Sequence, residues 1–277
     1  TLGGELVSYR DERGLEYIWG GDPAYWPGRN PLLFPIVGML KEGKIRFDGR
    51  EYAMERHGFA RRREFTPAAR GEDWVRLELR ESAETLALYP YPFRLAVEQR
   101  LTDTGFSTAV TVANPGEGPL PFCLGAHTGF RCPLEAGERF EDYELVFPER
   151  ESCPTLLLRD GLLDRPAALP CLEDTDTLPL DYRWFDALDT LIFEGLRSRS
   201  VALRSRKSGR GVRVSFDGFP MLAFWTMPGK KAPYLCIEPW HGCAAGTAEG
   251  PEFTDKAHCI VLAPGESRTL AYRADTL

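Results

Sequence analysis

Residues 234–242 read Tyr-Leu-Cys-Ile-Glu-Pro-Trp-His-Gly, a short apolar run that ends in a carboxylate followed by proline and tryptophan. The run predicts a strand that ends at Glu238, because Pro239 has no N–H to donate to a sheet ladder. A carboxyl group held beside Trp240 would be partly desolvated, which raises its pKa toward the range of a general base. Taken alone, the stretch favours the alternative, a Glu that makes a surface ion pair at a strand end.

Short runs of alternating apolar and polar residues extend from this stretch toward both ends of the chain, and helical periodicity is nearly absent. Residues 74–80 are one such run, and residues 44–54 are two of them joined by Asp-Gly, the pair that a two-residue type I′ turn prefers. A further hairpin is expected over residues 5–19. The pattern predicts an all-β fold of antiparallel sheets that pack face to face or close on themselves.

The least patterned part of the chain is residues 153–182, which contains four prolines. Strand alternation of the same kind resumes after it, so we interpret the segment as a long excursion within a domain. No sequence repeat, low-complexity tract or Ser/Gly linker divides the chain. We therefore predict one domain over residues 1–277.

Charge and cysteine usage exclude several classes of protein. The net charge of −7 argues against a surface for nucleic acid or anionic membrane. No apolar run approaches the ~20 residues needed to span a bilayer, and the amino-terminal residues lack the apolar core of a signal peptide. The seven cysteines are odd in number, scattered, and never paired as Cys-x-x-Cys, which predicts neither a zinc site nor a disulfide framework. We expect a cytoplasmic protein.

Two histidines lie where the chain can present them to a ligand. His57 precedes Gly58, which lets the backbone turn closely, so the imidazole is expected on a loop. His127 is flanked by small residues, and a nearby carboxylate would keep it protonated at neutral pH, as a general acid requires. The alternative for both is a structural His bonded to the backbone. The four histidines of the chain form no close pair at ligand spacing, so no metal site is predicted.

Arginines supply the candidate groups for substrate binding. Arg29 opens the stretch Arg-Asn-Pro-Leu-Leu-Phe-Pro-Ile-Val-Gly, and its forked guanidinium can hold two oxygens of a sugar or a phosphate. A solvated turn arginine is the alternative. The run Arg61-Arg62-Arg63 is most simply a solvated charge run, although it could meet an anionic substrate.

Three motifs in this order resemble the aldose 1-epimerase (galactose mutarotase-like) superfamily, in particular its bacterial LacX-like branch. They are the stretch from Arg29, the sequence Arg-His-Gly-Phe-Ala-Arg at 56–61, and Cys-Ile-Glu-Pro-Trp-x-Gly at 236–242. The resemblance implies a large antiparallel β-supersandwich with the sugar in a cleft on one sheet. It also implies an isomerase of carbohydrate metabolism that interconverts the α and β anomers of a hexose without a metal or cofactor.

Residue by residue, the resemblance implies that Glu238 is the general base and His127 the general acid, on opposite sides of the sugar ring. His57 matches the substrate-orienting histidine, and Arg29 the arginine that binds sugar hydroxyls. Asp189 is the best match to the aspartate that contacts the sugar, with Asp186 as its competitor. A hexose-6-phosphate 1-epimerase and a non-catalytic carbohydrate-binding protein on the same scaffold are the alternatives. The substrate sugar and the oligomeric state are left open.

Overall fold

A computed structural model describes residues 1–277. The strands are β1 (Leu32–Leu33), β2 (Lys44–Phe47), β3 (Arg50–Ala53), β4 (Thr66–Arg70), β5 (Trp74–Arg80), β6 (Arg94–Thr102), β7 (Gly105–Ala113), β8 (Leu120–Phe122), β9 (Leu124–Ala126), β10 (Thr128–Arg131), β11 (Tyr143–Arg159), β12 (Leu162–Pro179), β13 (Thr190–Glu194), β14 (Ser200–Ser205), β15 (Gly211–Ser215), β16 (Met221–Trp225), β17 (Tyr234–His241), β18 (Ile260–Leu262) and β19 (Ser267–Thr276). The helices are α1 (Ala83–Leu86), α2 (Tyr182–Leu188) and four single 3₁₀ turns, η1 (Lys41–Gly43), η2 (Ala60–Arg62), η3 (Phe140–Asp142) and η4 (Phe253–Asp255). None of the helices is long and apolar enough to span a membrane.

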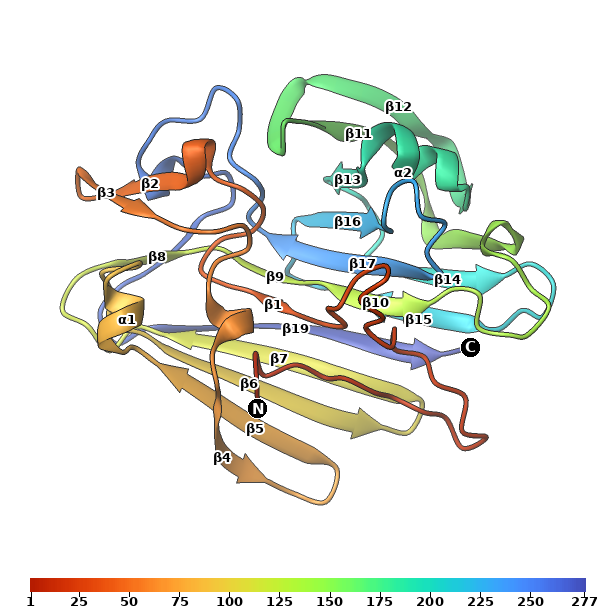
Figure 1. Cartoon of the computed structure of the whole chain (residues 1–277), viewed down its shortest axis with the longest axis horizontal. Coiled ribbons are helices and arrows are strands. Elements are labelled where there is room, and N and C mark those ends of the chain that lie inside the picture. Colours follow the sequence, from red (N-terminus) through yellow and green to blue (C-terminus); the bar gives the residue numbers. More distant parts are fainter.

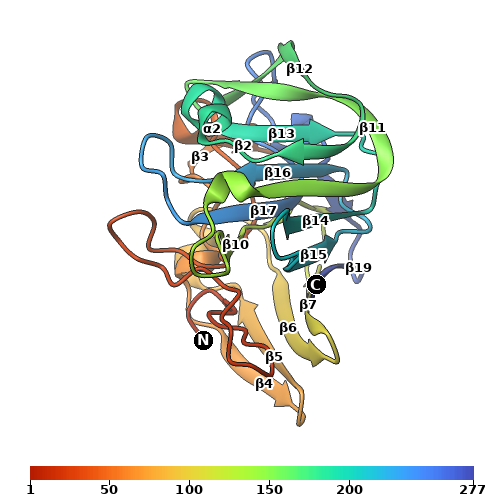
Figure 2. The ribbon, with the colours of Figure 1, turned by 90° about the vertical axis from the view of Figure 1, so that its right-hand side faces the viewer.

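Fifteen strands form one sheet in the order β1-β9-β17-β16-β13-β11-β14-β15-β19-β7-β6-β5-β4, with β10 paired to β17 and β12 paired to β11. The pairs β2–β3 and β8–β18 stand apart from it. Strand β12 lies at the opposite end of the molecule from β4 and β5 in both Figure 1 and Figure 2. The predicted all-β antiparallel fold is confirmed.

The main apolar core, of 65 buried residues, lies within the folded sheet, and a second cluster of four buried residues stands apart from it: Trp19, Ala232, Tyr234 and Cys236. On β7, Val110 and Val112 are buried, whereas Ala109 and Thr111 between them are half-buried. Burying a side chain of this size contributes about 1.5–3 kcal/mol relative to leaving it in water. The half-buried residues between them therefore add little to the stability of the fold. The row of buried side chains holds β7 in register with its neighbours.

The two predicted hairpins near the amino terminus have different outcomes. Residues 48–49 are the turn between β2 and β3, and Asp48 and Gly49 have φ of 50° and 75°, as a type I′ turn requires. The hairpin over residues 5–19 is reduced to isolated bridges such as Arg10 to Glu16. There the carboxylate of Glu16 accepts the N–H groups of Tyr9 at 2.9 Å and Ile18 at 3.0 Å. The side chain of Glu16 thus binds backbone N–H groups that would otherwise pair the two strands of a regular hairpin.

Residues 153–182 are regular, contrary to their interpretation as an unpatterned excursion. They form most of a long antiparallel ribbon of β11 and β12, in which four register shifts interrupt the pairing. The prolines are tolerated for two reasons. Strand β12 pairs only with β11, so one of its edges needs no N–H donors, and the shifts are bulges where pairing is already broken.

The strand that carries Glu238 does not end there, because β17 continues through Pro239 to His241. Its neighbour on one side is interrupted at this level, since β9 ends at Ala126 and β10 begins at Thr128. No pairing on that side is recorded for residues 238 and 239, so the missing N–H of Pro239 costs no ladder bond there. The same interruption creates the site described next.

Candidate active site

Strand register brings His127 and Glu238 together. Thr128 pairs with Ile237 across β10 and β17, and Gly125 pairs with Trp240 across β9 and β17, so the intervening His127 lies opposite Glu238. Nε2 of His127 is 3.3 Å from Oε1 of Glu238. The two residues are 8% and 1% exposed, which makes the contact a buried one. Two groups from distant parts of the chain therefore meet at the floor of a cleft.

The carboxyl group of Glu238 is held in place by its own strand. The indole N–H of Trp240 donates to Oε2 over 3.2 Å, which leaves Oε1 toward His127. Burial raises the pKa of Glu238 well above its usual range, the charge of Asp189 raises it further, and the bond from Trp240 opposes both. The raised pKa expected from the sequence is thus present, with burial as its main cause.

The imidazole of His127 is neutral, contrary to the expectation that a carboxylate would keep it protonated. It stacks on Trp26 with ring centroids 4.8 Å apart, and burial lowers its pKa to about 3. The positive charges of Arg61 and Arg56 lower it further. Burial raises the pKa of Glu238 as well, so both members of the pair are shifted toward their uncharged forms.

The cleft above this pair has a volume of about 270 Å³, near the lower end of the range for small-molecule sites. Three tryptophans give it apolar walls, and a small number of polar groups converge on its floor. The lining residues are Trp26, Gly38, Met39, Arg56, His57, Arg61, His127, Leu158, Gly161, Asp189, Thr190, Trp225, Met227, Glu238, Trp240 and Ala244.

His57 lies in the cleft on a loop, as predicted, and its ring centroid is 5.7 Å from that of His127. Its φ is 66° and that of Gly58 is 72°. A Cβ at Gly58 would lie 2.2 Å from the carbonyl oxygen of Phe34, so only glycine fits. Nδ1 of His57 accepts the N–H of Gly38 over 3.1 Å. Burial lowers the pKa of His57 well below its usual range, so the ring is neutral and Nε2 carries its one N–H.

The family model for aldose 1-epimerase matches residues 1–274. The chain belongs to the aldose 1-epimerase family. It is 41% identical to the plasmid-encoded protein LacX of Lactococcus lactis subsp. lactis over 280 residues, which covers 98% of this chain and 93% of LacX. This agrees with the predicted branch of the superfamily, and the family is one of isomerases that act as mutarotase-like sugar epimerases.

Two solved structures have the fold of this epimerase family member. A galactose mutarotase related enzyme from Lactobacillus acidophilus superposes with a TM-score of 0.95 at 28% identity, covering 100% of this chain and 92% of that one. A galactose mutarotase-like protein from Lactobacillus casei ATCC 334 gives a TM-score of 0.90 at 29% identity, covering 100% and 95%. The predicted galactose mutarotase-like supersandwich is therefore the fold of this epimerase.

Arg29 is not among the residues that line the cleft of this epimerase, and its predicted contact with sugar hydroxyls stays a prediction. Its Nε donates to the carbonyl of Gly20 over 3.0 Å, and its backbone N–H donates to the carboxylate of Glu5 over 2.8 Å. The guanidinium is thus used to close a loop. Two other arginines, Arg56 and Arg61, reach the cleft instead.

Neither of these two cleft arginines has a carboxylate partner. Nη2 of Arg56 contacts Sδ of Met39 at 2.8 Å, and Nη2 of Arg61 donates to the carbonyl of Arg56 over 2.9 Å. The buried Nε of Arg61 has no hydrogen-bond partner within the protein. The next two residues of the run, Arg62 and Arg63, pair with Glu55 and Glu84 and do not line the cleft. Part of the run is therefore a solvated charge run, as expected, and Arg61 is not.

The structure separates the two candidate aspartates. Asp189 follows α2 with φ of 64°, lines the cleft, and accepts a hydrogen bond from Oγ1 of Thr190 over 3.2 Å. Asp186 lies outside the cleft and accepts the N–H of Gly229 over 2.7 Å. Asp189 is therefore the aspartate placed to meet a ligand, and its contact with a sugar remains a prediction.

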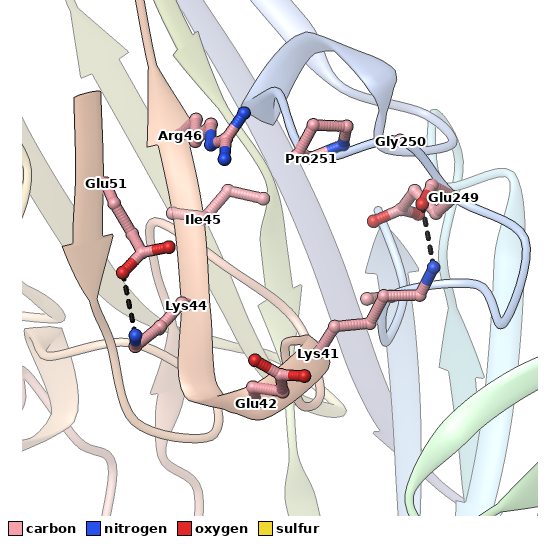
Figure 3. A pocket seen from close by; sticks show the side chains of 10 residues that line it. Lys41, Glu42, Lys44, Ile45, Arg46, Glu51, Glu249, Gly250 and Pro251 are labelled. Atoms are coloured by element: carbon pink, nitrogen blue, oxygen red, sulfur yellow. Dashed lines mark hydrogen bonds and ion pairs between the residues drawn. The ribbon is translucent and has the colours of Figure 1, made fainter. Parts of the chain in front are cut away.

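A second hollow, of about 300 Å³, lies between the β2–β3 hairpin and the loop at 249–251 (Figure 3). Its charged groups largely satisfy one another. Nζ of Lys44 is 2.7 Å from the carboxylate of Glu51, and Nζ of Lys41 donates to the carbonyl of Glu249 over 2.8 Å. It contains no histidine and no aromatic wall, so the proton-transfer chemistry belongs to the other cleft.

Sequence reasoning did not find the aromatic walls. Trp26 and Trp225 both contact His127, with ring centroids 4.8 Å and 5.6 Å from that of the imidazole, and they contact each other edge to face at 5.5 Å. Trp26 lies in a loop and Trp225 ends β16, so no common periodicity links them. A tryptophan followed by Pro-Gly in an irregular segment was the one available signal for Trp26.

Proposed function

We propose that this protein is an aldose 1-epimerase that interconverts the α and β anomers of a hexose, with Glu238 and His127 as its proton-transferring pair. The supporting observation is the 3.3 Å contact between Nε2 of His127 and Oε1 of Glu238 on the floor of a sugar-sized cleft. A general acid and a general base must both lie within reach of the atoms they serve. Family membership supports the reaction class.

The chemistry explains why the two groups adjoin. Anomer exchange removes the proton of the C1 hydroxyl and gives a proton to the ring oxygen as the bond from C1 to the ring oxygen breaks. Both oxygens are bonded to C1, so one pair of neighbouring side chains can serve both. The opposite-side arrangement expected from the sequence is replaced by a contact on one wall. Rotation about C1–C2 and the reverse transfers then close the ring to the other anomer.

The pair needs one proton to perform this exchange. With Glu238 as base and His127 as acid, the pair starts as carboxylate and imidazolium and ends as carboxylic acid and imidazole. Burial of both groups favours the second of these forms. From that form, ring opening balances in two ways: the proton of Glu238 first moves to His127, or the roles are exchanged, so that neutral His127 takes the C1 hydroxyl proton while the carboxylic acid of Glu238 protonates the ring oxygen. Each proton transfer contributes about 100-fold or more to the rate.

Other cleft residues position the sugar in this proposal. The neutral His57 offers Nε2–H as a donor, and the carboxylate of Asp189 offers acceptors on the facing wall. The indole faces of Trp26 and Trp225 cover the apolar side of a pyranose ring. Holding a reactant in one orientation supplies several kcal/mol of the barrier reduction, of order 10³-fold or more in rate.

A hexose 6-phosphate is the second candidate substrate, and Arg56 and Arg61 favour it. Both guanidinium groups line the cleft without a carboxylate partner, in a chain whose net charge is −7. Unpaired arginines at a ligand site suit a phosphate, which a guanidinium binds through two oxygens.

Polarimetry of freshly dissolved α-D-glucose, α-D-galactose and their 6-phosphates tests the proposal. We expect the protein to accelerate mutarotation of at least one of the four, and salt to weaken its action only on the phosphates. Sugar binding by calorimetry without acceleration of any of them would identify a non-catalytic carbohydrate-binding protein on this scaffold.

A further inference from the structure

Cys236 places a thiol beside the proton-transferring pair. It lies two residues before Glu238 on β17, so both side chains project from the same face of the sheet. On the neighbouring strand, Cys236 is paired with Gly129, one residue after Thr128, which follows His127. A ring nitrogen of His127, Sγ of Cys236 and a carboxylate oxygen of Glu238 all lie within 4.8 Å of one another, and all three residues are buried.

These three donor types match the preferences of one class of ion. Zinc binds thiolate, imidazole and carboxylate, and its catalytic sites combine three protein ligands with one open position. A tetrahedral zinc ion, with bonds of about 2.0 Å to nitrogen and oxygen and about 2.3 Å to sulfur, separates its ligand atoms by about 3.4–3.6 Å. The imidazole and the carboxylate are already 3.3 Å apart. A shift of about 1 Å brings the sulfur from within 4.8 Å to ligand spacing.

We propose that His127, Cys236 and Glu238 form a binding site for a thiophilic divalent cation such as Zn²⁺. Binding releases the protons of the Cys236 thiol and the Glu238 carboxyl group to solvent. The two positive charges of the ion then offset one thiolate and one carboxylate around a neutral imidazole, so the filled site is electrically balanced. The ion enters from the cleft, which His127 and Glu238 line and behind which Cys236 lies. The bond from Trp240 to Oε2 orients the carboxylate and leaves Oε1 as the ligand atom.

The expected consequence is inhibition, and this part rests on the proposed function. A bound ion takes up both proton-transferring groups and fills the floor of the cleft. Sugar and Zn²⁺ therefore compete for the same free enzyme. Inhibition should be competitive with the sugar and reversed by a chelator.

No metal site is predicted from the sequence, because the four histidines form no close pair along the chain. Cys236 and Glu238 lie on β17 and His127 lies between β9 and β10, so only the register of these two strands on β17 brings the three ligands together. The chain has one other contact between a histidine and a carboxylate, in which Nε2 of His258 contacts Glu194. These two side chains are 29% and 28% exposed and lack a thiol, so a spectroscopic probe separates the two sites.

The experiment uses the full chain with CoCl₂ and ZnCl₂ as probes. Co²⁺ bound to thiolate gives a sulfur-to-metal charge-transfer band, which reports the site whether or not the protein turns over sugar. Calorimetry measures the affinity for Zn²⁺, and polarimetry measures inhibition. Cys236→Ala removes the thiol, Cys236→Val removes it while filling its space, and Cys259→Ala is the matched control at another thiol.

We expect wild type and Cys259→Ala to show the charge-transfer band and competitive inhibition by Zn²⁺. Both Cys236 variants should lose the band. Their affinity for Zn²⁺ should fall by about 100-fold or more, because the loss of a residue that only hydrogen-bonds to a metal ligand already lowers metal affinity by about 10- to 100-fold. Absence of the band in wild type, or equal inhibition of wild type and both Cys236 variants, overturns the proposal. A wild type that shows the band but no mutarotation would refute the proposed function and leave the metal site standing.

Discussion

Trp240 donates its indole N–H over 3.2 Å to Oε2 of Glu238, a residue on the same strand and the same face. The bond favours the charged form of the carboxyl group, against the effect of burial. Replacing Trp240 with Phe should therefore raise the pKa of Glu238 further and lower kcat by about tenfold, because the carboxyl loses its orientation. A pH profile of kcat/KM should show the alkaline limb displaced upward. Trp74→Phe, beside Arg100 and outside the cleft, is the control expected to change neither quantity.

Glu238→Gln and His127→Asn should each lower kcat for anomer exchange by about 10²–10⁴-fold, because each removes one of the two proton-transferring groups. The double variant should lose little more than either single variant, since the two groups act as one unit. Polarimetry measures the rates, and circular dichroism checks that the fold is kept. His241→Asn is the matched control, because that ring lies outside the cleft and bonds to the carbonyl of His258 at 2.8 Å. Strictly additive losses would contradict a shared role.

The pH dependence of kcat/KM should be a broad plateau in metal-free buffer. Burial lowers the pKa of His127 to about 3 and raises that of Glu238 well above its usual range, so the pair keeps one proton between these limits. The pH dependence reports the number of protons bound by the pair as a whole, so it is the same whichever of the two residues holds the shared proton. We expect constant kcat/KM from about pH 5 to about pH 8. An acid limb near the ordinary histidine pKa of about 6.5 would show that His127 titrates freely.

The burial of Glu238 predicts that this residue lowers the stability of the folded state at neutral and alkaline pH. The pKa of Glu238 is higher in the folded state than in the unfolded state, so folding takes up a proton. The folded state therefore loses stability as the pH rises above the pKa that Glu238 has in the unfolded chain. Glu238→Gln needs no such proton. We expect its unfolding midpoint to exceed that of wild type by about 2 °C or more at pH 8, and the two to agree near pH 4. Thermal unfolding followed by circular dichroism measures both, and a lower midpoint for the variant at pH 8 would contradict the prediction.

Arg61→Met tests the phosphate alternative. If Arg61 binds a substrate phosphate, kcat/KM for the preferred hexose 6-phosphate should fall by about 10- to 100-fold, the cost of a charge-assisted hydrogen bond. The salt dependence of the reaction should weaken as well. Arg62→Met is the matched control, because the neighbouring guanidinium pairs with Glu55 outside the cleft. Equal effects of Arg61→Met on a free hexose and on its 6-phosphate would assign Arg61 to another role.

Local patterns in the sequence predicted those features that depend on local causes. The positive φ values of Asp48 and Gly49 follow from the turn chemistry of the pair itself. The prediction that the strand ends at Glu238 was wrong. Pro239 breaks a sheet hydrogen bond only where a neighbouring strand runs past it, and on one side of β17 that neighbour is interrupted. The regular β11–β12 ribbon was missed for the same reason, since the edge position of β12 is a property of the whole sheet.

The site residues show the same division. The motifs singled out His57, His127, Glu238 and Asp189, which all line one cleft and whose roles there stay predictions. They could not say where the guanidinium of Arg29 points, because a carbonyl and a carboxylate from other loops compete for its donors. The raised pKa of Glu238 was predicted, whereas the lowered pKa of His127 was not, because it depends on the burial of the imidazole in the folded protein.

At the interruption between β9 and β10, paired strands hold the proton-transferring pair, whereas several other cleft residues lie on connections. The spacing of His127 and Glu238 is set by main-chain pairing on both sides of the gap, whereas Arg56, Arg61 and Asp189 lie on connections between strands. Connections tolerate exchange far better than paired strands do. Grafting the connections of a relative onto this scaffold should therefore alter which sugar is accepted while the reacting groups keep their alignment.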